Sequence, residues 1–232
     1  MSLVVCNSLF IIFNSMFDKI QSSFLWFFIA YVFLVGFVLF ALQKGTFELW
    51  LNQQHSTFLD LFFRGFDWVG DGVFFGLVVV GLAFYKYYYS LLALAALLLN
   101  SIVAQGLKRT IFEGTPRPKA FFPPDTALYY AIPPETVHSS NSFPSGHSTT
   151  AISVMLLLTI VFNNKILGVV FFFCALAGSL ARVYLLQHFL VDTYAGMCIG
   201  FICTLLLYYY FEKNKALQQN TFWQKGIYSR KH

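Results

Sequence analysis

Charged residues are scarce in this chain. They make up 11% of its 232 residues, whereas soluble globular domains carry about 25%. Hydrophobic residues reach 58%, aromatic residues reach 20%, and the mean hydropathy is +0.66. This composition excludes an ordinary soluble domain and predicts an integral membrane protein. The length suits a single helical bundle.

Cysteine is also sparse, and internal repeats and low-complexity linkers are lacking. The four cysteines show no spacing to one another, or to a histidine, that is typical of a metal site: Cys6, Cys174, Cys198 and Cys203. We interpret them as small buried hydrophobic residues. Residues 1–15 are apolar but lack the basic start of a signal peptide. Residues 1–23 are therefore interpreted as an N-terminal lead-in, either interfacial or poorly ordered.

Six apolar runs each approach the length of about 20 residues that a helix needs to cross a bilayer. The expected spans are Phe24–Leu42, Gly72–Tyr85, Tyr87–Leu107, Ser148–Phe162, Ile166–Ala181 and Phe189–Phe211. The predicted fold is all-α, an integral membrane six-helix bundle over residues 24–211, followed by a basic tail at 212–232. Ser56–Phe66 is predicted to be either a short amphipathic helix at the interface or a simple connector.

The distribution of Lys and Arg predicts the orientation. With the N-terminus inside, the inner segments hold most basic residues, as the positive-inside rule expects. These residues are Lys19, Lys86, Lys165, Lys213, Lys215, Lys225, Arg230 and Lys231. Both termini are then cytoplasmic. The outer segments nevertheless carry five basic residues, which an anionic ligand would explain: Lys108, Arg109, Arg117, Lys119 and Arg182.

His188 and Asp192 lie four residues apart where the fifth span gives way to the sixth. On a helix they share one face, so the carboxylate can accept the Nδ1 proton of the imidazole. That arrangement leaves Nε2 as a nucleophile or a base. The structural alternative is a polar pair that stabilises the start of a helix at the interface.

The sequence Pro144-Ser145-Gly146-His147 leads straight into the fourth span. A helix N-terminus offers free N–H groups and the positive end of a dipole, and Gly146 lets the backbone approach a ligand closely. This pattern is typical of an anion cradle, with His147 at its mouth to donate a proton. Ordinary helix capping explains the serines but not His147.

Two cations flank the same outer surface. Lys108 ends the third span, and Arg117 is stiffened by a proline on each side. Alone, they are typical of an interfacial lysine and a loop arginine. Together with Arg182 and the two histidines, they predict a site that stabilises a transferring phosphoryl group. A metal site built from His147, His188 and Asp192 is an alternative, disfavoured because clustered Lys and Arg repel a dication.

These motifs resemble the type 2 phosphatidic acid phosphatase superfamily, which also includes vanadium-dependent haloperoxidases. The residues that carry the resemblance are Lys108…Arg117-Pro118, Pro144-Ser145-Gly146-His147 and Arg182-x5-His188-x3-Asp192. There are two departures from the family pattern. The Lys108 to Arg117 spacing is two residues wider, which makes Arg109 a rival for the lysine role, and Ala181 stands where the family commonly has serine.

The resemblance implies that His188 attacks phosphorus and becomes phosphohistidine, that Asp192 orients it, and that His147 protonates the leaving oxygen. The phosphate oxygens are expected to be held by Lys108, Arg117, Ser145, Gly146 and Arg182. The implied activity is that of a metal-independent phosphatase, without a cofactor, that acts on a lipid phosphate or diphosphate. A bacterial member would act, at the outer face of the inner membrane, on undecaprenyl diphosphate, phosphatidylglycerol phosphate, phosphatidic acid or lipid A, and not on nucleic acid. Lipid-to-lipid phosphotransfer and a non-catalytic lipid-binding or transport role are the alternatives.

Overall fold

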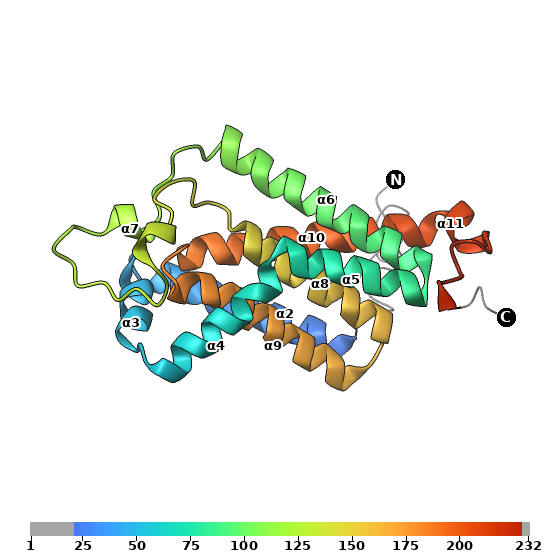
Figure 1. The fold of residues 1–232 in the computed structure, drawn as a ribbon, viewed down its shortest axis with the longest axis horizontal. Helices are drawn as coiled ribbons and strands as arrows, with labels where there is room; N and C mark the ends of the chain where they lie inside the picture. The colour runs from blue at the N-terminus through green and yellow to red at the C-terminus, as the bar shows by residue number, and fades with distance from the viewer. Residues whose placement is uncertain (1–20, 229–232) are drawn as a thin grey trace, which may run out of the picture.

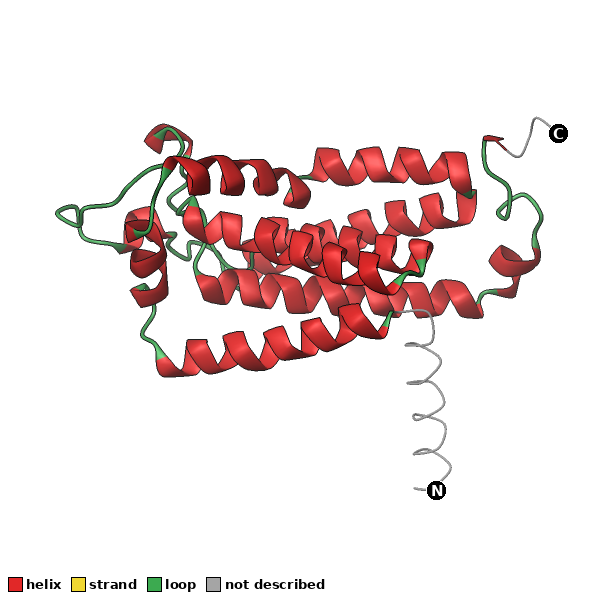
Figure 2. Ribbon diagram, turned by 90° about the horizontal axis from the view of Figure 1, so that it is seen from below, coloured by secondary structure: helices red, strands yellow, loops and turns green. Residues whose placement is uncertain are grey.

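Long helices run side by side along most of the chain (Figure 1). The structure is a computed structural model that describes residues 21–228, and within this range all regular elements are helices, with no strand (Figure 2). They are α2 (Ser22–Ala41), α3 (Thr46–Gln53), α4 (Thr57–Asp67), η1 (Trp68–Gly70), α5 (Gly72–Tyr85), α6 (Tyr87–Thr110), α7 (Pro118–Phe121), η2 (Pro134–Thr136), α8 (Gly146–Phe162), α9 (Lys165–Tyr184), α10 (Leu190–Lys213) and α11 (Lys215–Gln219). Most of the expected lead-in lies outside the described residues.

All six runs predicted to cross the membrane are helical, so the all-α membrane bundle is confirmed. By length and hydropathy, α2, α6, α9 and α10 can each span a bilayer, whereas α8 is apolar but has 17 residues. Large apolar side chains cover the outward faces; Phe33 is 75% exposed and Phe40 is 90% exposed. Exposed apolar surface of this extent is typical of contact with lipid.

The second predicted span continues backwards into the helix before it. Thr57–Gly70 and Gly72–Tyr85 together pass as one span, but they are bent by 57°. The break falls at Asp71, whose extended backbone interrupts the helix and whose carboxylate caps α5 by accepting from Val73 N at 2.7 Å. Of the two interpretations of residues 56–66, the helix is confirmed, with Ser56 as its N-cap.

The described ends of the chain lie at one end of the bundle, and the polar loops lie at the other (Figure 1). At the first end, Ser23 Oγ donates to the Lys165 carbonyl at 2.8 Å. The C-terminal segment folds back here, and Tyr87 N donates to Lys225 O at 2.9 Å. The described part of the predicted basic tail therefore packs against the α5–α6 turn.

Helices α8 and α10 pack so closely that α10 needs glycine at the contact. A Cβ at Gly196 would lie 2.5 Å from Ser145 O, and one at Gly200 would lie 2.3 Å from Thr149 O. Any side chain at these positions would push the two helices apart. The contact joins the starts of both helices, where Ser145 N donates to Asp192 O at 3.0 Å.

Helix α6 turns one stripe of residues to the bundle. Their spacing of three or four residues keeps them on one helical face: Ala93, Ala96, Asn100, Ala104 and Lys108. Midway along, Asn100 Nδ2 donates to Ser153 Oγ of α8 at 3.0 Å and to Thr204 Oγ1 of α10 at 3.2 Å. This buried link fixes the rotation of α6, and the stripe ends on Lys108 at the polar end of the bundle.

The long polar loop after α6 is fastened at its middle. Asn52 of α3 donates from Nδ2 to Tyr129 O at 2.8 Å and accepts Tyr129 N at 2.9 Å. The Tyr129 hydroxyl donates to Asp60 of α4, which also accepts the hydroxyl of Tyr184. The His55 ring stacks on Tyr129 with centroids 3.9 Å apart. The loop is therefore held against α3 and α4.

Candidate active site

A chain of three hydroxyl groups caps the start of α8. Ser145 Oγ accepts from Ser148 N at 3.3 Å and from Ser148 Oγ at 3.0 Å. Ser148 Oγ in turn accepts from Ser179 Oγ at 2.9 Å. Because Ser145 is the acceptor at the end of this chain, its own proton can be donated to a ligand. Gly146 follows, and no atom lies within 4 Å of where its Cβ would be, so the backbone there can be approached.

A tight turn sets the backbone of His188. Leu186 adopts a left-handed conformation with φ of 55°, which is uncommon for a residue other than glycine. The turn lets Gln187 N and His188 N both donate to Arg182 O, at 2.9 and 3.0 Å. Arg182 and His188 are therefore joined through the main chain, which fixes their relative positions.

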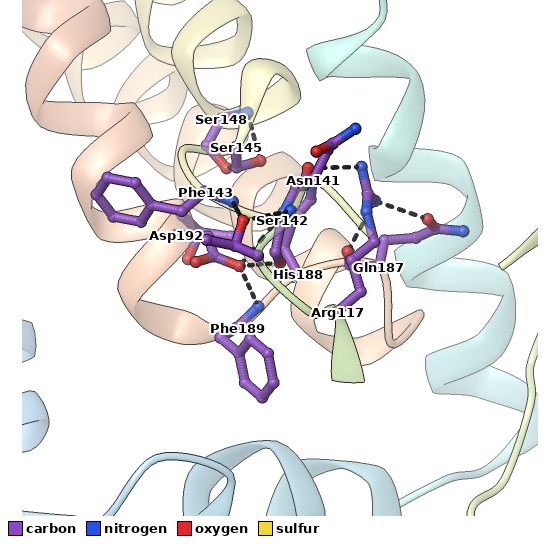
Figure 3. A network of polar contacts seen from close by, with 12 residues as sticks. Arg117, Asn141, Ser142, Phe143, Ser145, Ser148, Gln187, His188, Phe189 and Asp192 are labelled. Atoms are coloured by element: carbon purple, nitrogen blue, oxygen red, sulfur yellow. Dashed lines mark hydrogen bonds and ion pairs between the residues drawn. The ribbon is translucent and has the colours of Figure 1, made fainter. Parts of the chain in front are cut away.

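Asp192 is the centre of the polar network (Figure 3). Its Oδ2 accepts the Ser142 hydroxyl and also Phe189 N, the latter at 2.9 Å. His188 Nδ1 lies 3.4 Å from the same oxygen, and it has no hydrogen-bond partner among residues 21–228. The predicted His188–Asp192 pair is thus brought together, but without a formed hydrogen bond. Such contacts commonly tighten only when a substrate is bound.

The His188 ring is buried and neutral. The side chain is 2% exposed. Burial, and then the charges of Arg117, Arg182 and Lys108, hold the pKa of His188 well below its ordinary value. A neutral ring at physiological pH retains the lone pair that a nucleophile needs.

Arg117 is held by neutral groups. Its Nε donates to Ser140 O at 2.8 Å, and its Nη1 donates to Gln187 O at 2.8 Å and to Gln187 Oε1 at 3.1 Å. Burial and the charge of Arg182 lower the pKa of Arg117 to about 10, so the guanidinium stays charged at neutral pH. Its positive charge is positioned by these carbonyls but not neutralised by them.

The structure separates the two candidate cations at the end of α6. Lys108 is 8% exposed and lies within electrostatic reach of Arg117 and Arg182. Arg109 is exposed and lies on the wall of a polar hollow of about 640 Å³, which we call the basic vestibule. Lys119 and His138 line the same hollow, and Lys108 and Arg117 reach it from the site.

The guanidinium group of Arg182 has a partner at Nη1 but not at Nε. Its Nη1 donates to Asp67 Oδ1 at 2.9 Å and to Asp67 Oδ2 at 3.0 Å. Its Nε is buried and has no partner in the described part of the chain. A buried donor without an acceptor costs about 1–3 kcal/mol. This nitrogen therefore marks a position that an oxyanion can fill.

His147 lies on the first turn of α8, packed against η1. A Cβ at Gly70 would lie 2.7 Å from His147 O, so glycine is needed for this contact. The His147 ring is partly buried, within electrostatic reach of Arg182 and Asp67. His147 and His188 thus belong to the same charged cluster.

Sequence reasoning missed the side chains that hold this site in place. Ser142 and Gln187 lie within or beside the predicted motifs, so their position was itself a signal. Asp67 stands 115 residues from Arg182 in the chain, and no local pattern marks it.

The ends of α6 and α9, the starts of α8 and α10 and the loop after α6 bring together the eight predicted site residues: Lys108, Arg117, Ser145, Gly146, His147, Arg182, His188 and Asp192. Within residues 21–228, no three His, Cys, Asp or Glu side chains gather as metal ligands do. Three cations, a helix N-terminus and two histidines instead match the charge and the donor requirements of a tetrahedral oxyanion.

Comparisons with known proteins agree with this geometry. A family model described as the PAP2 superfamily matches residues 89–216. Among solved structures, LpxE of Aquifex aeolicus is similar, with a TM-score of 0.62 and 24% identity; the match covers 71% of this chain and 94% of that one. A search of the curated proteins finds no match. The matched residues contain all eight predicted site residues, whereas α2–α5 precede them.

Proposed function

Because this chain belongs to the PAP2 superfamily, we propose that it is a membrane phosphatase that removes a phosphate group from a lipid. His188 is the nucleophile, Asp192 orients it, and His147 is the proton donor. The phosphate oxygens are bound by Lys108, Arg117, Ser145, Gly146 and Arg182.

The observation that carries this proposal is the surplus of buried positive charge around His188. Lys108, Arg117 and Arg182 are 8%, 7% and 8% exposed. Burial of each ion costs several kcal/mol unless an opposite charge compensates it. Asp67 and Asp192 set two carboxylates against these three cations, and Arg182 Nε has no hydrogen-bond partner among residues 21–228. A phosphate dianion supplies both the missing charge and the missing acceptor.

The reaction then runs in two displacements at one phosphorus atom. His188 Nε2 attacks phosphorus, the bond from phosphorus to the leaving oxygen breaks, and His147 gives that oxygen its proton. A water molecule next attacks the phosphorus of the phosphohistidine and gives a proton to His147. The phosphorus–nitrogen bond breaks, which releases inorganic phosphate and restores His188. The cations and the Gly146 N–H stabilise the charge on the equatorial oxygens in both steps.

The position of the site supports a lipid substrate. It lies at the end of the spans, where a phosphorylated headgroup can enter while its tail stays in the bilayer. Lys86, Lys165 and Lys213 lie at the opposite end of the bundle, which the positive-inside rule assigns to the cytoplasm. We infer an outward-facing site in a bacterial inner membrane, and a substrate such as undecaprenyl diphosphate, phosphatidylglycerol phosphate, phosphatidic acid or lipid A.

A panel of these lipids, assayed with the purified protein in detergent, tests reaction class and substrate together. We expect release of inorganic phosphate, and its loss in His188→Ala at unchanged expression and melting temperature. Turnover by His188→Ala at the wild-type rate would rule out the nucleophile role. A phosphorylated acceptor lipid in place of free phosphate would show transfer instead of hydrolysis.

Two further measurements test the mechanism. Acid-labile, alkali-stable label should be trapped on the protein after rapid quenching with substrate labelled in its phosphate, and it should be absent from His188→Ala. Turnover should be unchanged in excess EDTA. A loss of turnover that added divalent metal restores would contradict metal independence.

A further inference from the structure

Two carboxylates from different parts of the chain hold the N-terminus of α10. Asp192 accepts Phe189 N at 2.9 Å from within the same helix. Glu48 of α3 accepts Leu190 N at 2.6 Å from outside it. These two N–H groups directly follow His188. The main chain after the nucleophile is therefore fixed by two side chains, one of which comes from α3.

Glu48 is unusually buried for a carboxylate, with an exposure of 3%. Burial raises the pKa of Glu48, although the N–H groups of Leu190, Glu48 and Gly45 act in the opposite direction. The carboxylate thus lies in the first turn of α3 and caps the N-terminus of α10, where acceptors and negative charge are favourable. This buried carboxylate, like that of Asp192, lies beside the segment that carries His188.

Cation–π and aromatic contacts pack the start of α3 against the start of α10 beside Glu48. Lys44 lies just before α3, and its Nζ is 4.1 Å from the centroid of the Phe189 ring and 5.3 Å from that of Phe121. The Phe121 and Phe189 rings meet edge to face with centroids 5.2 Å apart. The start of α3, helix α7 and the start of α10 therefore pack as one unit around the residue that follows His188.

We propose that Glu48 is a positioning residue for His188, which acts through the Leu190 N–H to set the direction of the imidazole toward phosphorus. This role rests on the proposed phosphatase function, and Glu48 lies outside the residues that the family model matches. A displacement of about 1 Å between reacting groups can cost about 100-fold in rate. Loss of the contact should therefore reduce kcat more than it changes KM.

Three variants separate positioning from simple helix capping. Glu48→Ala removes the acceptor, whereas Glu48→Gln keeps an oxygen that can accept Leu190 N. Glu48→Asp keeps the charge, but its shorter side chain withdraws the oxygen from Leu190. Gln53→Ala is the matched control, because Gln53 is an exposed residue of the same helix.

Steady-state kinetics on a lipid phosphate, normalised to folded protein, is the first test. We expect kcat to fall about 10- to 100-fold in Glu48→Ala and Glu48→Asp, with KM within about 3-fold of wild type. Glu48→Gln should stay within about 3-fold of wild type, and Gln53→Ala should match it. Hydrogen–deuterium exchange of the peptide covering residues 185–192 is the second test. Exchange should be faster in Glu48→Ala and Glu48→Asp than in Glu48→Gln.

Wild-type kcat in folded Glu48→Ala overturns the proposal, as does a loss confined to KM or a Glu48→Gln variant as impaired as Glu48→Ala. If Glu48→Ala does not fold, Glu48→Asp decides by the same criteria. Failure of the wild type to release phosphate from any lipid counts against the proposed function instead. The exchange comparison still applies in that case, and equal exchange in all variants overturns the hold of Glu48 on the 185–192 segment.

Discussion

Arg182 and Asp67 form an ion pair in which one guanidinium nitrogen, Nη1, lies 2.9 and 3.0 Å from the two carboxylate oxygens. The pair joins α9 to the end of α4. Because Asp67 occupies Nη1 alone, Nε has no partner among residues 21–228 and can bind a ligand. Asp67 thus orients Arg182 and neutralises only part of the positive charge at the site.

Removal of Asp67 should therefore weaken turnover. A hydrogen bond to a charged group contributes about 1.5–3 kcal/mol, so Asp67→Ala should lower kcat/KM about 10- to 100-fold, as measured by phosphate release. Asp67→Asn keeps an acceptor and should lose less. Asp125→Ala, at an exposed loop position, serves as the control. Equal kcat/KM in Asp67→Ala and Asp125→Ala would contradict the orienting role.

The burial of Lys108 and the exposure of Arg109 predict unequal effects on catalysis. Lys108→Ala should reduce kcat/KM about 100-fold or more, because a preorganised group that stabilises transition-state charge is typically worth about 2.7–4 kcal/mol. Arg109→Ala should reduce it no more than about 3-fold, as expected for an exposed charge. If Arg109→Ala lowers kcat/KM more than Lys108→Ala does, the assignment of the phosphate-binding role to Lys108 is wrong.

The lowered pKa of His188 predicts the response of turnover to acid. Burial is the main cause, and the charge of Arg117 is the next. In the proposed mechanism only the neutral ring attacks phosphorus, so turnover should be intact above the lowered pKa and should be lost as pH falls through it. Arg117→Gln removes one positive neighbour and should raise this pKa. The acid limb of the kcat/KM profile should then move to higher pH; an unmoved limb would contradict the coupling.

The same pKa shift predicts a pH-dependent stability. In the unfolded chain, the pKa of histidine is about 6.5, whereas the pKa of folded His188 is held well below that value. Below pH 6.5 the unfolded state therefore binds more protons, and stability falls as pH falls. Between pH 7 and 5, the melting temperature of the wild type should drop more steeply than that of His188→Ala. Parallel slopes would argue against a depressed pKa.

Asn52 should matter for stability, not for chemistry. Asn52→Ala leaves the N–H and C=O groups of Tyr129 without their partners, at a cost of about 1–3 kcal/mol. Thermal unfolding in detergent should show a lower melting temperature than in Gln53→Ala, whose side chain is exposed on the same helix. An unchanged melting temperature would mean that water satisfies the freed groups.

The sequence was sufficient to predict the helices and the motifs, because both have local signals. Apolar runs identified the spans, and the residues around Gly146 and His188 carried recognisable chemistry. The spacing of residues in α6 also indicates that Lys108, and not Arg109, faces the bundle. Residues Ala93 through Ala104 form a stripe of mostly small residues with helical spacing, and this stripe continues onto Lys108, not Arg109.

The supporting residues could not be predicted in the same way. Glu48 stands 142 residues from Leu190, and Asp67 stands 115 residues from Arg182. Each contact depends on how α3 and α4 fold back over the site, which no local periodicity reports. The 57° bend at Asp71 was missed for a related reason. A capping aspartate beside glycines is compatible with both a helix start and a broken span.

The two hydrogen bonds between the Asn52 side chain and the Tyr129 backbone divide one long loop into two shorter ones. The entropic cost of closing a loop grows only with the logarithm of its length. Here that cost arises when the chain folds, and not when a ligand binds. Arg117 lies in one half and Asn141 in the other, so both walls of the basic vestibule are assembled before any ligand arrives. The outer bend over residues 123–128 contributes nothing to those walls. It can therefore accept insertions or a proteolytic cut while the chemistry beneath it is preserved.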